Sequence, residues 1–495
     1  MAAVNGELAA LDATAQAELV RSGEASPTEL AEAAIARIEA LNPELGAVIH
    51  PLFEEGLAEA AGRLPDGPFR GVPFLFKDIG ASYAGQPLHM GTRALRDAGF
   101  RAPADTYLAQ RFRAAGLVTL GKTNVPELGL LPTTEPDAYG PTRNPWDPAR
   151  IAGGSSGGAA AAVASGMVPM AHANDGAGSI RIPASACGLV GLKPTRARIS
   201  EGPVVGDVNG GMSCELVVSR SVRDTAAILD AVHGPAPGDP YVAPAPVRPY
   251  SAELDAPDGP LRIGVMTASL AGLKVDPVVV DATLEAAALL EELGHGVDQG
   301  AAPAGFESLD LLETFMTRWA AGAAAGVALA GALAGRRLGS GDLEPLTHAL
   351  AEQGRAVSAP RYLAVINRHQ TMARLIAGWY EQGPFDLLLT PTLGEPPPPL
   401  GTFDDSGPDP LRAIDRAKLT GAFAGAFNAT GQPAISLPLC ASPEGLPVGI
   451  QLVAPYGRED VLIRIAAQLE RARPWAERRP AVFAGTPAEL EPHRG

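Results

Sequence analysis

The stretch that decides the fold is residues 151–195, IAGGSSGGAAAAVASGMVPMAHANDGAGSIRIPASACGLVGLKPT. It opens with the glycine- and serine-rich loop Gly153–Gly158, which passes directly into an alanine-rich segment that predicts a helix ending near Gly166. Met167–His172 then has the apolar run of a buried strand. A flexible linker of this composition would not lead at once into an apolar helix and strand, so the loop belongs to a packed fold.

The alternation of helix and strand continues outward from this stretch. Ser26–Glu29 has the pattern of a capping box and predicts a helix through Leu41, which Asn42-Pro43 should stop. Val72–Phe76 predicts a buried strand with Lys77 at its end. Further elements are predicted as a helix at 106–115 and strands at 117–120, 167–172, 261–266, 385–392, 434–437 and 448–453. Strands that alternate with helices predict an α/β fold, in which helices cover both faces of a central mixed β-sheet.

The chain has 495 residues, of which 46% are hydrophobic, and these can form a large core. We expect one domain, 1–495, whose core at about 65–230 holds both glycine-rich serine loops. A proline-rich connector at 235–260 follows, and then a variable helical segment at about 280–380. The uncharged stretch 319–335 is too short and too weakly apolar to predict a membrane span, so we expect a buried helix there.

The overall composition excludes several classes of function. A formal charge of −16 argues against nucleic acid and against anionic membrane surfaces as partners. The three cysteines are widely spaced and lack a CxxC pair, which argues against a disulfide framework and a zinc site. The first twenty residues have neither the basic nor the apolar region of a signal peptide, so we expect a cytoplasmic protein.

Three familiar kinds of site are also not expected. Residues 116–123, GLVTLGKT, satisfy the phosphate-loop pattern, but the four residues between the glycines read as a strand and no helix follows the lysine. The eight histidines form no HExxH motif, and His172 at a strand end is interpreted as a structural histidine. No Gly-x-Ser-x-Gly elbow is present. We therefore expect no metal, no nucleotide and no serine–histidine triad.

Serine chemistry remains, because Ser155 and Ser179 both lie among glycines. Glycine neighbours allow backbone N–H groups to converge on one point, as an oxyanion hole requires. A serine nucleophile needs a base, and no histidine is arranged to serve. A lysine can act as the base if its pKa falls by about 3 units, and Lys77 follows an apolar strand where burial would produce such a shift.

These residues resemble the amidase signature family. Phe76-Lys77-Asp78 is similar to the lysine motif of that family, Gly153–Gly158 to its GGSSGG loop, and Asp175–Pro183 to its nucleophile loop. The separation of Ser155 from Ser179 also matches. Gly191–Thr195 and Gly431–Pro438 are further family-like segments, and the combination is far more specific than any one piece.

The resemblance implies a Ser–cis-Ser–Lys triad of Ser179, Ser155 and Lys77, which cleaves amides through an acyl-enzyme without a cofactor. It also implies an oxyanion hole built from the backbone N–H groups of Gly176, Ala177, Gly178 and Ser179. The family more often has Thr-Gly-Gly-Ser in this loop, and we expect Ala177 to be tolerated if its φ is negative. Asp175 and Arg181 are expected to pair beneath the loop, and Ser156 to hydrogen-bond it.

The substrate is less determined than the reaction. The resemblance points to small linear or cyclic amides, and aryl amides, carbamates and esters remain open. The chain diverges most at 300–385, where we expect substrate contacts; Met316 and Trp319 would then stand at the entrance of an alanine- and glycine-rich helix that leaves room for an aliphatic chain. Two rival roles are the amidase subunit of a tRNA-dependent amidotransferase and a non-catalytic binding module. A homodimer is left open.

Overall fold

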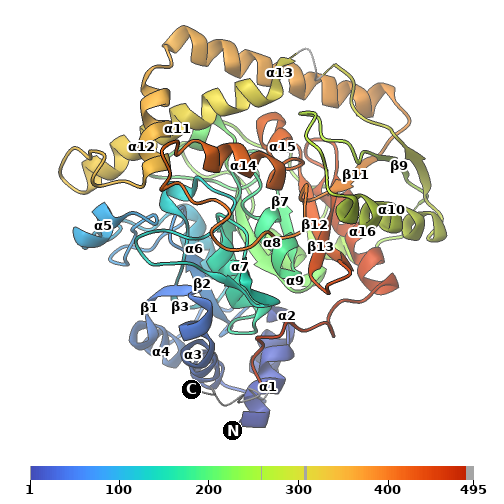
Figure 1. Cartoon of the computed structure of the whole chain (residues 1–495). Coiled ribbons are helices and arrows are strands. Elements are labelled where there is room, and N and C mark those ends of the chain that lie inside the picture. Colours follow the sequence, from blue (N-terminus) through green and yellow to red (C-terminus); the bar gives the residue numbers. More distant parts are fainter. Residues whose placement is uncertain (1, 258, 306–308, 486–495) are drawn as a thin grey trace, which may run out of the picture.

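An eleven-stranded mixed sheet runs through the computed structural model, which describes residues 2–257, 259–305 and 309–485 (Figure 1). The strand order is β1-β3-β2-β6-β8-β7-β12-β13-β11-β9-β10. The strands are β1 (Val48–Pro51), β2 (Pro73–Lys77), β3 (Val118–Thr123), β6 (Met170–Asn174), β7 (Val190–Lys193), β8 (Glu215–Ser219), β9 (Arg262–Val265), β10 (Gly296–Gln299), β11 (Leu387–Pro391), β12 (Ala434–Ala441) and β13 (Pro447–Val453), with a separate ribbon of β4 (Arg143–Asn144) and β5 (Asp147–Ile151).

In the centre of the sheet the strand direction reverses between β6 and β8. Strand β2 pairs parallel with β3 and with β6, whereas β8 pairs antiparallel with both β6 and β7. This order places the ends of β2, β6 and β8 side by side, although they are far apart in sequence. The predicted mixed α/β sheet is therefore confirmed.

Helices pack on the sheet along its length, for example α4 on β3, α7 on β6 and α10 on β11. Long helices α11, α12 and α13 form a separate layer at the top of Figure 1, with α14 and α15 between that layer and the sheet. The α-helices are α1 (Ala2–Ala10), α2 (Ala13–Ser22), α3 (Pro27–Leu45), α4 (Phe53–Ala61), α5 (Arg93–Asp97), α6 (Tyr107–Ala114), α7 (Gly157–Ala164), α8 (Arg181–Cys187), α9 (Val222–Val232), α10 (Pro277–Glu292), α11 (Leu311–Leu333), α12 (Pro345–Arg355), α13 (Ala359–Gln382), α14 (Arg412–Thr420), α15 (Gly425–Thr430) and α16 (Glu459–Ala472).

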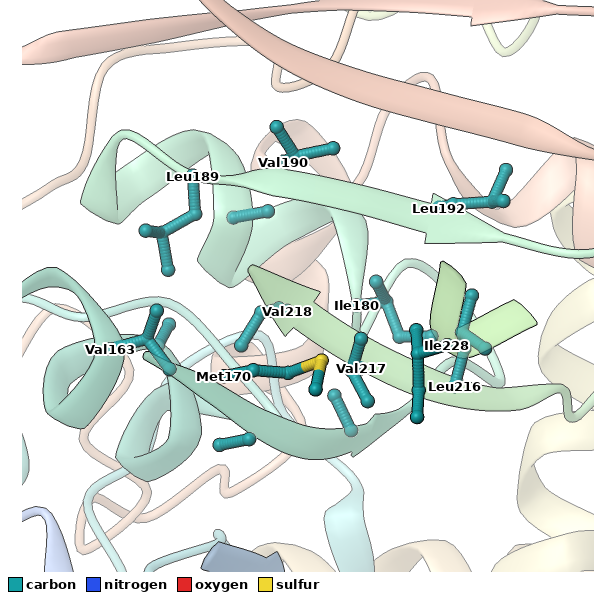
Figure 2. Close-up of a cluster of buried hydrophobic side chains, with 14 of the residues drawn as sticks. Val163, Met170, Ile180, Leu189, Val190, Leu192, Leu216, Val217, Val218 and Ile228 are labelled. Carbon is teal, nitrogen blue, oxygen red and sulfur yellow. The ribbon is translucent and has the colours of Figure 1, made fainter. Parts of the chain in front are cut away.

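An apolar cluster packs around the central strands β6, β8 and β7. Figure 2 shows Met170 of β6, Val217 of β8 and Leu192 of β7 in one cluster with Val163 of α7 and Ile180, and none of these side chains is exposed. Strands buried on both faces read as continuous apolar runs, which explains why the segment of β6 was predicted from sequence. The short strands β7 and β8 were not predicted. The packing holds the loops before α7 and α8 firmly in place.

The first long helix departs from the prediction at its end. The capping box at Ser26 is present, but α3 continues through Pro43 to Leu45, so the predicted stop at Asn42-Pro43 is wrong. In the last turn a proline removes only one helical hydrogen bond. The side chain of Asn42 also bonds both backbone groups of Val48, which holds the turn closed, and Gly46 (φ 60°) ends the helix.

The uncharged stretch 319–335 belongs mostly to α11, and its small residues serve helix packing. A Cβ on Gly354 of α12 would overlap the carbonyl oxygen of Ala320, so the two helices approach closely. None of the described helices combines the length and the apolarity that a membrane crossing requires. Residues 118–123, which belong to the segment that matches the phosphate-loop pattern, form strand β3. A strand was predicted at 117–120.

Candidate active site

Lys77 lies at the end of β2 with its side chain completely buried. Its Nζ is 2.7 Å from Ser155 Oγ and donates to Asn174 Oδ1 at 2.6 Å. The peptide bond between Gly154 and Ser155 is cis. A neutral lysine that donates to Asn174 keeps its lone pair, which can accept the hydroxyl proton of Ser155.

The surroundings favour that neutral form. Burial lowers the pKa of Lys77 from 10.5 to about 7, although the negative charges of Glu215 and Asp175 act in the opposite direction. A base with a pKa near neutrality is deprotonated in a large fraction of molecules at pH 7 and still holds a proton well. Lys77 therefore has the environment that a general base needs.

The loop that carries Ser179 is held from beneath by an ion pair. Asp175 and Arg181 are both fully buried, and Arg181 donates to the two carboxylate oxygens at 2.9 and 3.0 Å. Burial by itself would raise the pKa of Asp175, but the Arg181 guanidinium holds it well below its usual range. Asn428 of α15 donates to both the carboxylate and the carbonyl of Asp175. The expected pair beneath the loop is present.

Ser156 has the supporting contact that was expected of it. Its Oγ donates to the carbonyl oxygen of Asn174 at 3.3 Å, which joins the first serine loop to the end of β6. Its side chain is buried and does not line the cavity described below.

The expected set of oxyanion donors needs one correction. Gly178 N–H donates to Asp175 Oδ1 at 2.6 Å, so the carboxylate already occupies this donor. Gly178 instead shapes the loop: its φ is +120°, and a Cβ there would lie 2.6 Å from Ala424 Cβ. The N–H groups of Gly176, Ala177 and Ser179 donate to no described residue and remain available to a ligand. Ala177 has no positive φ, as its side chain requires.

Ser179 and Ser155 are not hydrogen-bonded to each other in the described part of the chain, so the structure does not contain the second link of the expected relay. Hydrogen bonds of this kind are often long without substrate and tighten in the complex. Ser179 lines a cavity of about 110 Å³ together with Gly154, the residue that precedes Ser155.

The walls of this cavity are almost entirely apolar. They come from the segment 129–132, from α11 and from α14 and α15, and include Leu130, Phe315, Met316, Trp319, Ile414 and Ala426. Trp319 Nε1 donates to the carbonyl of Leu130, and its ring stacks on Phe315. Lys418 is the one charged residue among those described that line the cavity, and it pairs with Asp415.

The prediction for the helical segment holds only in part. Met316 and Trp319 do line the cavity, but the rest of 319–335 does not: Ala320 packs against Gly354 of α12, and other small residues of this stretch are exposed. The contributions from 129–132 and from α14 and α15 had no signal in the sequence.

Three polar residues behind Lys77 were not assigned from sequence. Asn174 contacts Lys77 Nζ, His172 Nδ1 accepts the backbone N–H of Lys77 at 3.3 Å, and Glu215 contacts both of them. His172 is therefore a satisfied buried histidine, as its interpretation predicted. A periodicity of two, with His172 and Asn174 on one face of β6, was the available signal.

On the other side of Lys77, the structure brings His50, Asp78 and His89 together, with one nitrogen or oxygen of each within 4.8 Å of the others. Lys122 Nζ lies 3.5 Å from Asp78 Oδ1; burial lowers the pKa of Lys122, and the charge of Asp78 acts in the opposite direction. None of these residues lines the cavity described above, and they have no part in the chemistry proposed below.

Comparison with known proteins agrees with this geometry. The sequence model of the family described as Amidase matches residues 29–463. The 6-aminohexanoate-cyclic-dimer hydrolases of Pseudomonas sp. (strain NK87) and Paenarthrobacter ureafaciens are each 46% identical over 480 residues, which cover 95% of this chain and 97% of theirs. The solved structure of 6-aminohexanoate cyclic dimer hydrolase complexed with substrate is similar with a TM-score of 0.91 and 45% identity, over 96% of this chain and 99% of that one.

A bacterial aryl acylamidase of the amidase signature family is more distant. Its structure gives a TM-score of 0.84 at 28% identity, over 94% of this chain and 97% of that one.

Proposed function

This chain belongs to the amidase signature family, and from that premise we propose that it hydrolyses small linear or cyclic amides, 6-aminohexanoate oligomers among them, through a Ser179–Ser155–Lys77 triad. The observation that carries the proposal is the buried Lys77, with its pKa lowered to about 7, at 2.7 Å from Ser155 Oγ and beside the cavity that Ser179 lines.

In the proposed mechanism neutral Lys77 accepts the proton of Ser155, which accepts that of Ser179. Ser179 Oγ then attacks the amide carbonyl carbon, and the carbonyl oxygen takes the negative charge. The N–H groups of Gly176, Ala177 and Ser179 are the donors available to this oxygen. The relay returns the proton to the departing amine nitrogen, which leaves an ester on Ser179. Water then attacks this ester with the same base.

The cavity supports an uncharged aliphatic acyl group. Apolar walls gain free energy from buried methylene groups, about 0.8 kcal/mol for each, but they have nothing to offer a charged group. The similarity to the two cyclic-dimer hydrolases supports 6-aminohexanoate amides within this class. Aryl amides and carbamates are the second class to test, because the aryl acylamidase has a similar fold.

Covalent labelling tests the nucleophile. A fluorophosphonate probe followed by peptide mass spectrometry is expected to modify Ser179, and Ser179→Ala is expected to lose both the label and the activity. The control is Ser156→Ala, which removes a neighbouring hydroxyl from outside the cavity. A label on Ser156, or full activity of Ser179→Ala, would contradict the triad.

The substrate is tested by comparing kcat/KM for the cyclic dimer, the linear dimer, an anilide, a carbamate and a primary amide. The highest value is expected for an aliphatic secondary amide. Turnover of the primary amide alone would contradict the substrate class and leave the triad intact. The purified chain is expected to act without a partner, unlike an amidotransferase subunit.

A further inference from the structure

A closed ring of hydrogen bonds lies behind the candidate base. Lys77 Nζ donates to Asn174 Oδ1 at 2.6 Å, and Asn174 Nδ2 donates to Glu215 Oε1 at 3.2 Å. Glu215 Oε2 lies 2.6 Å from His172 Nε2, and His172 Nδ1 accepts the backbone N–H of Lys77 at 3.3 Å. The ring of hydrogen bonds therefore begins at the side-chain Nζ of Lys77 and closes at the backbone N–H of the same residue.

The donors and acceptors in this ring permit one arrangement. His172 Nδ1 accepts a backbone N–H and carries no proton, so the proton of the neutral ring is on Nε2 and is donated to Glu215. Burial lowers the pKa of His172, which agrees with a neutral ring. A carboxylate only accepts, so Asn174 must turn its amide nitrogen to Glu215 and its carbonyl oxygen to Lys77. Glu215 thus holds both neighbours, and the carbonyl oxygen of Ile79, which accepts from Asn174 Nδ2 at 3.3 Å, supports the same orientation of the amide.

We propose that Glu215 is a positioning residue for the amide hydrolysis proposed above. By accepting from Asn174 and His172 it fixes the Asn174 carbonyl against Lys77 Nζ, so that the amine directs its lone pair to Ser155 Oγ. Glu215 touches no substrate and acts only through these neighbours. This inference rests on the proposed function, because it requires Lys77 to be the base.

The order of the central strands and a glycine next to them make room for the contacts between Lys77, Asn174 and Glu215. Lys77, Asn174 and Glu215 lie on β2, β6 and β8, three neighbouring strands at the centre of the sheet. Gly80 follows the base with φ +91°, and a Cβ there would lie 2.6 Å from Glu215 Oε1 and 2.7 Å from Asn174 Nδ2. Only glycine leaves this space for the ring.

The negative charge of Glu215 also acts on the pKa of Lys77. Glu215 and Asp175 are the negative groups that raise the pKa of Lys77 against burial, so the loss of either charge should lower it further. Two further titratable groups belong to these surroundings: His172, which is part of the ring, and Lys122 of β3. The positive charge of Lys122 lowers the pKa of His172. Removal of Glu215 should therefore change both the orientation of Asn174 and the titration of the base.

The test is the pH profile of Glu215→Gln, measured with the cyclic dimer and with an activated p-nitrophenyl ester. A glutamine cannot accept from both neighbours, so kcat is expected to fall about 10- to 100-fold with KM little changed. The acidic limb of kcat/KM should also move to lower pH by about one unit, as expected for a unit charge removed a few ångströms away.

Glu201→Gln is the matched control. Burial, together with the charge of Glu215, raises the pKa of Glu201 to about 8, so this carboxyl is mostly uncharged at neutral pH. Its replacement should leave kcat and the acidic limb unchanged.

Asn174→Ala separates orientation from charge. It removes the link between Glu215 and Lys77 while the carboxylate stays, so kcat should fall with a smaller shift of the acidic limb. Wild-type kcat and an unmoved limb in Glu215→Gln would overturn the inference. If that variant does not fold, wild-type kcat in Asn174→Ala would overturn it equally.

The Ser179→Ala variant keeps this failure distinct from failure of the proposed function. Full activity of Ser179→Ala would refute the triad itself. An inactive Ser179→Ala beside a wild-type-like Glu215→Gln would refute only the role of Glu215.

Discussion

Replacing Lys77 by methionine should remove activity and, at neutral pH, make the protein more stable. The fall of the Lys77 pKa from 10.5 to about 7 means that folding opposes protonation of this side chain by about 5 kcal/mol. Methionine fills the same buried space without that cost. It also gives up the contacts with Ser155 and Asn174, about 1 kcal/mol each, which leaves a net gain of about 3 kcal/mol at pH 7.

The pH dependence is the decisive feature of this prediction. Between about pH 7 and 10.5 the unfolded chain binds a proton at Lys77 that the folded chain does not, so wild-type stability rises with pH across this window. The advantage of Lys77→Met should therefore be largest at pH 7 and below, vanish at about pH 9, where the cost of burying the amine has fallen to the roughly 2 kcal/mol of lost contacts, and reverse toward pH 10.5. Urea unfolding at pH 6.5, 8 and 10 measures it, with Ser155→Ala as a control that keeps the lysine. An equal difference in free energy of unfolding at all three pH values would refute the reasoning.

Three further predictions concern the surroundings of the triad. Asp175→Asn leaves the buried Arg181 without its counter-charge and should lower the free energy of unfolding by about 3–5 kcal/mol, measured in urea; an unchanged value would contradict the ion pair. Gly80→Ala should reduce kcat strongly, since its Cβ meets a carboxylate, whereas Gly85→Ala, with φ +79° and open space around it, should cost about 1 kcal/mol of strain and keep kcat. Ile414→Trp should fill part of the cavity and lower kcat/KM for the cyclic dimer at least about 10-fold more than for a short acetyl ester; equal losses would place the acyl group elsewhere.

The loops that carry the proposed triad could be predicted because their signals are local. Gly153–Gly158 and the loop around Ser179 carry their glycines where the backbone turns, and the apolar strand before Lys77 already implies burial of the amine. The pair of Asp175 and Arg181 was also predictable, since the two residues are close in sequence.

The partners that come from distant segments could not be predicted. Glu215 lies on β8, and only the strand order reveals that it faces Asn174. The contribution of Ile414 to the cavity likewise depends on how α14 packs over the sheet. Pro43 was predicted to end α3, but the effect of a proline depends on how many helical hydrogen bonds follow it, and few remain in the last turn of α3.

The cavity walls and the residues of the proposed proton relay belong to different parts of the molecule. Lys77, Asn174 and Glu215 stand on the central strands β2, β6 and β8, and the two serines lie in the loops before α7 and α8. Helices α11, α14 and α15 supply a large share of the cavity walls. A mutation in a wall residue such as Phe315 or Ile414 therefore leaves the strands that hold Lys77 in register. Variation and selection can then alter the acyl group that is accepted while the machinery for cleavage is inherited intact, and a laboratory library confined to these helices would explore new amides without rebuilding the nucleophile.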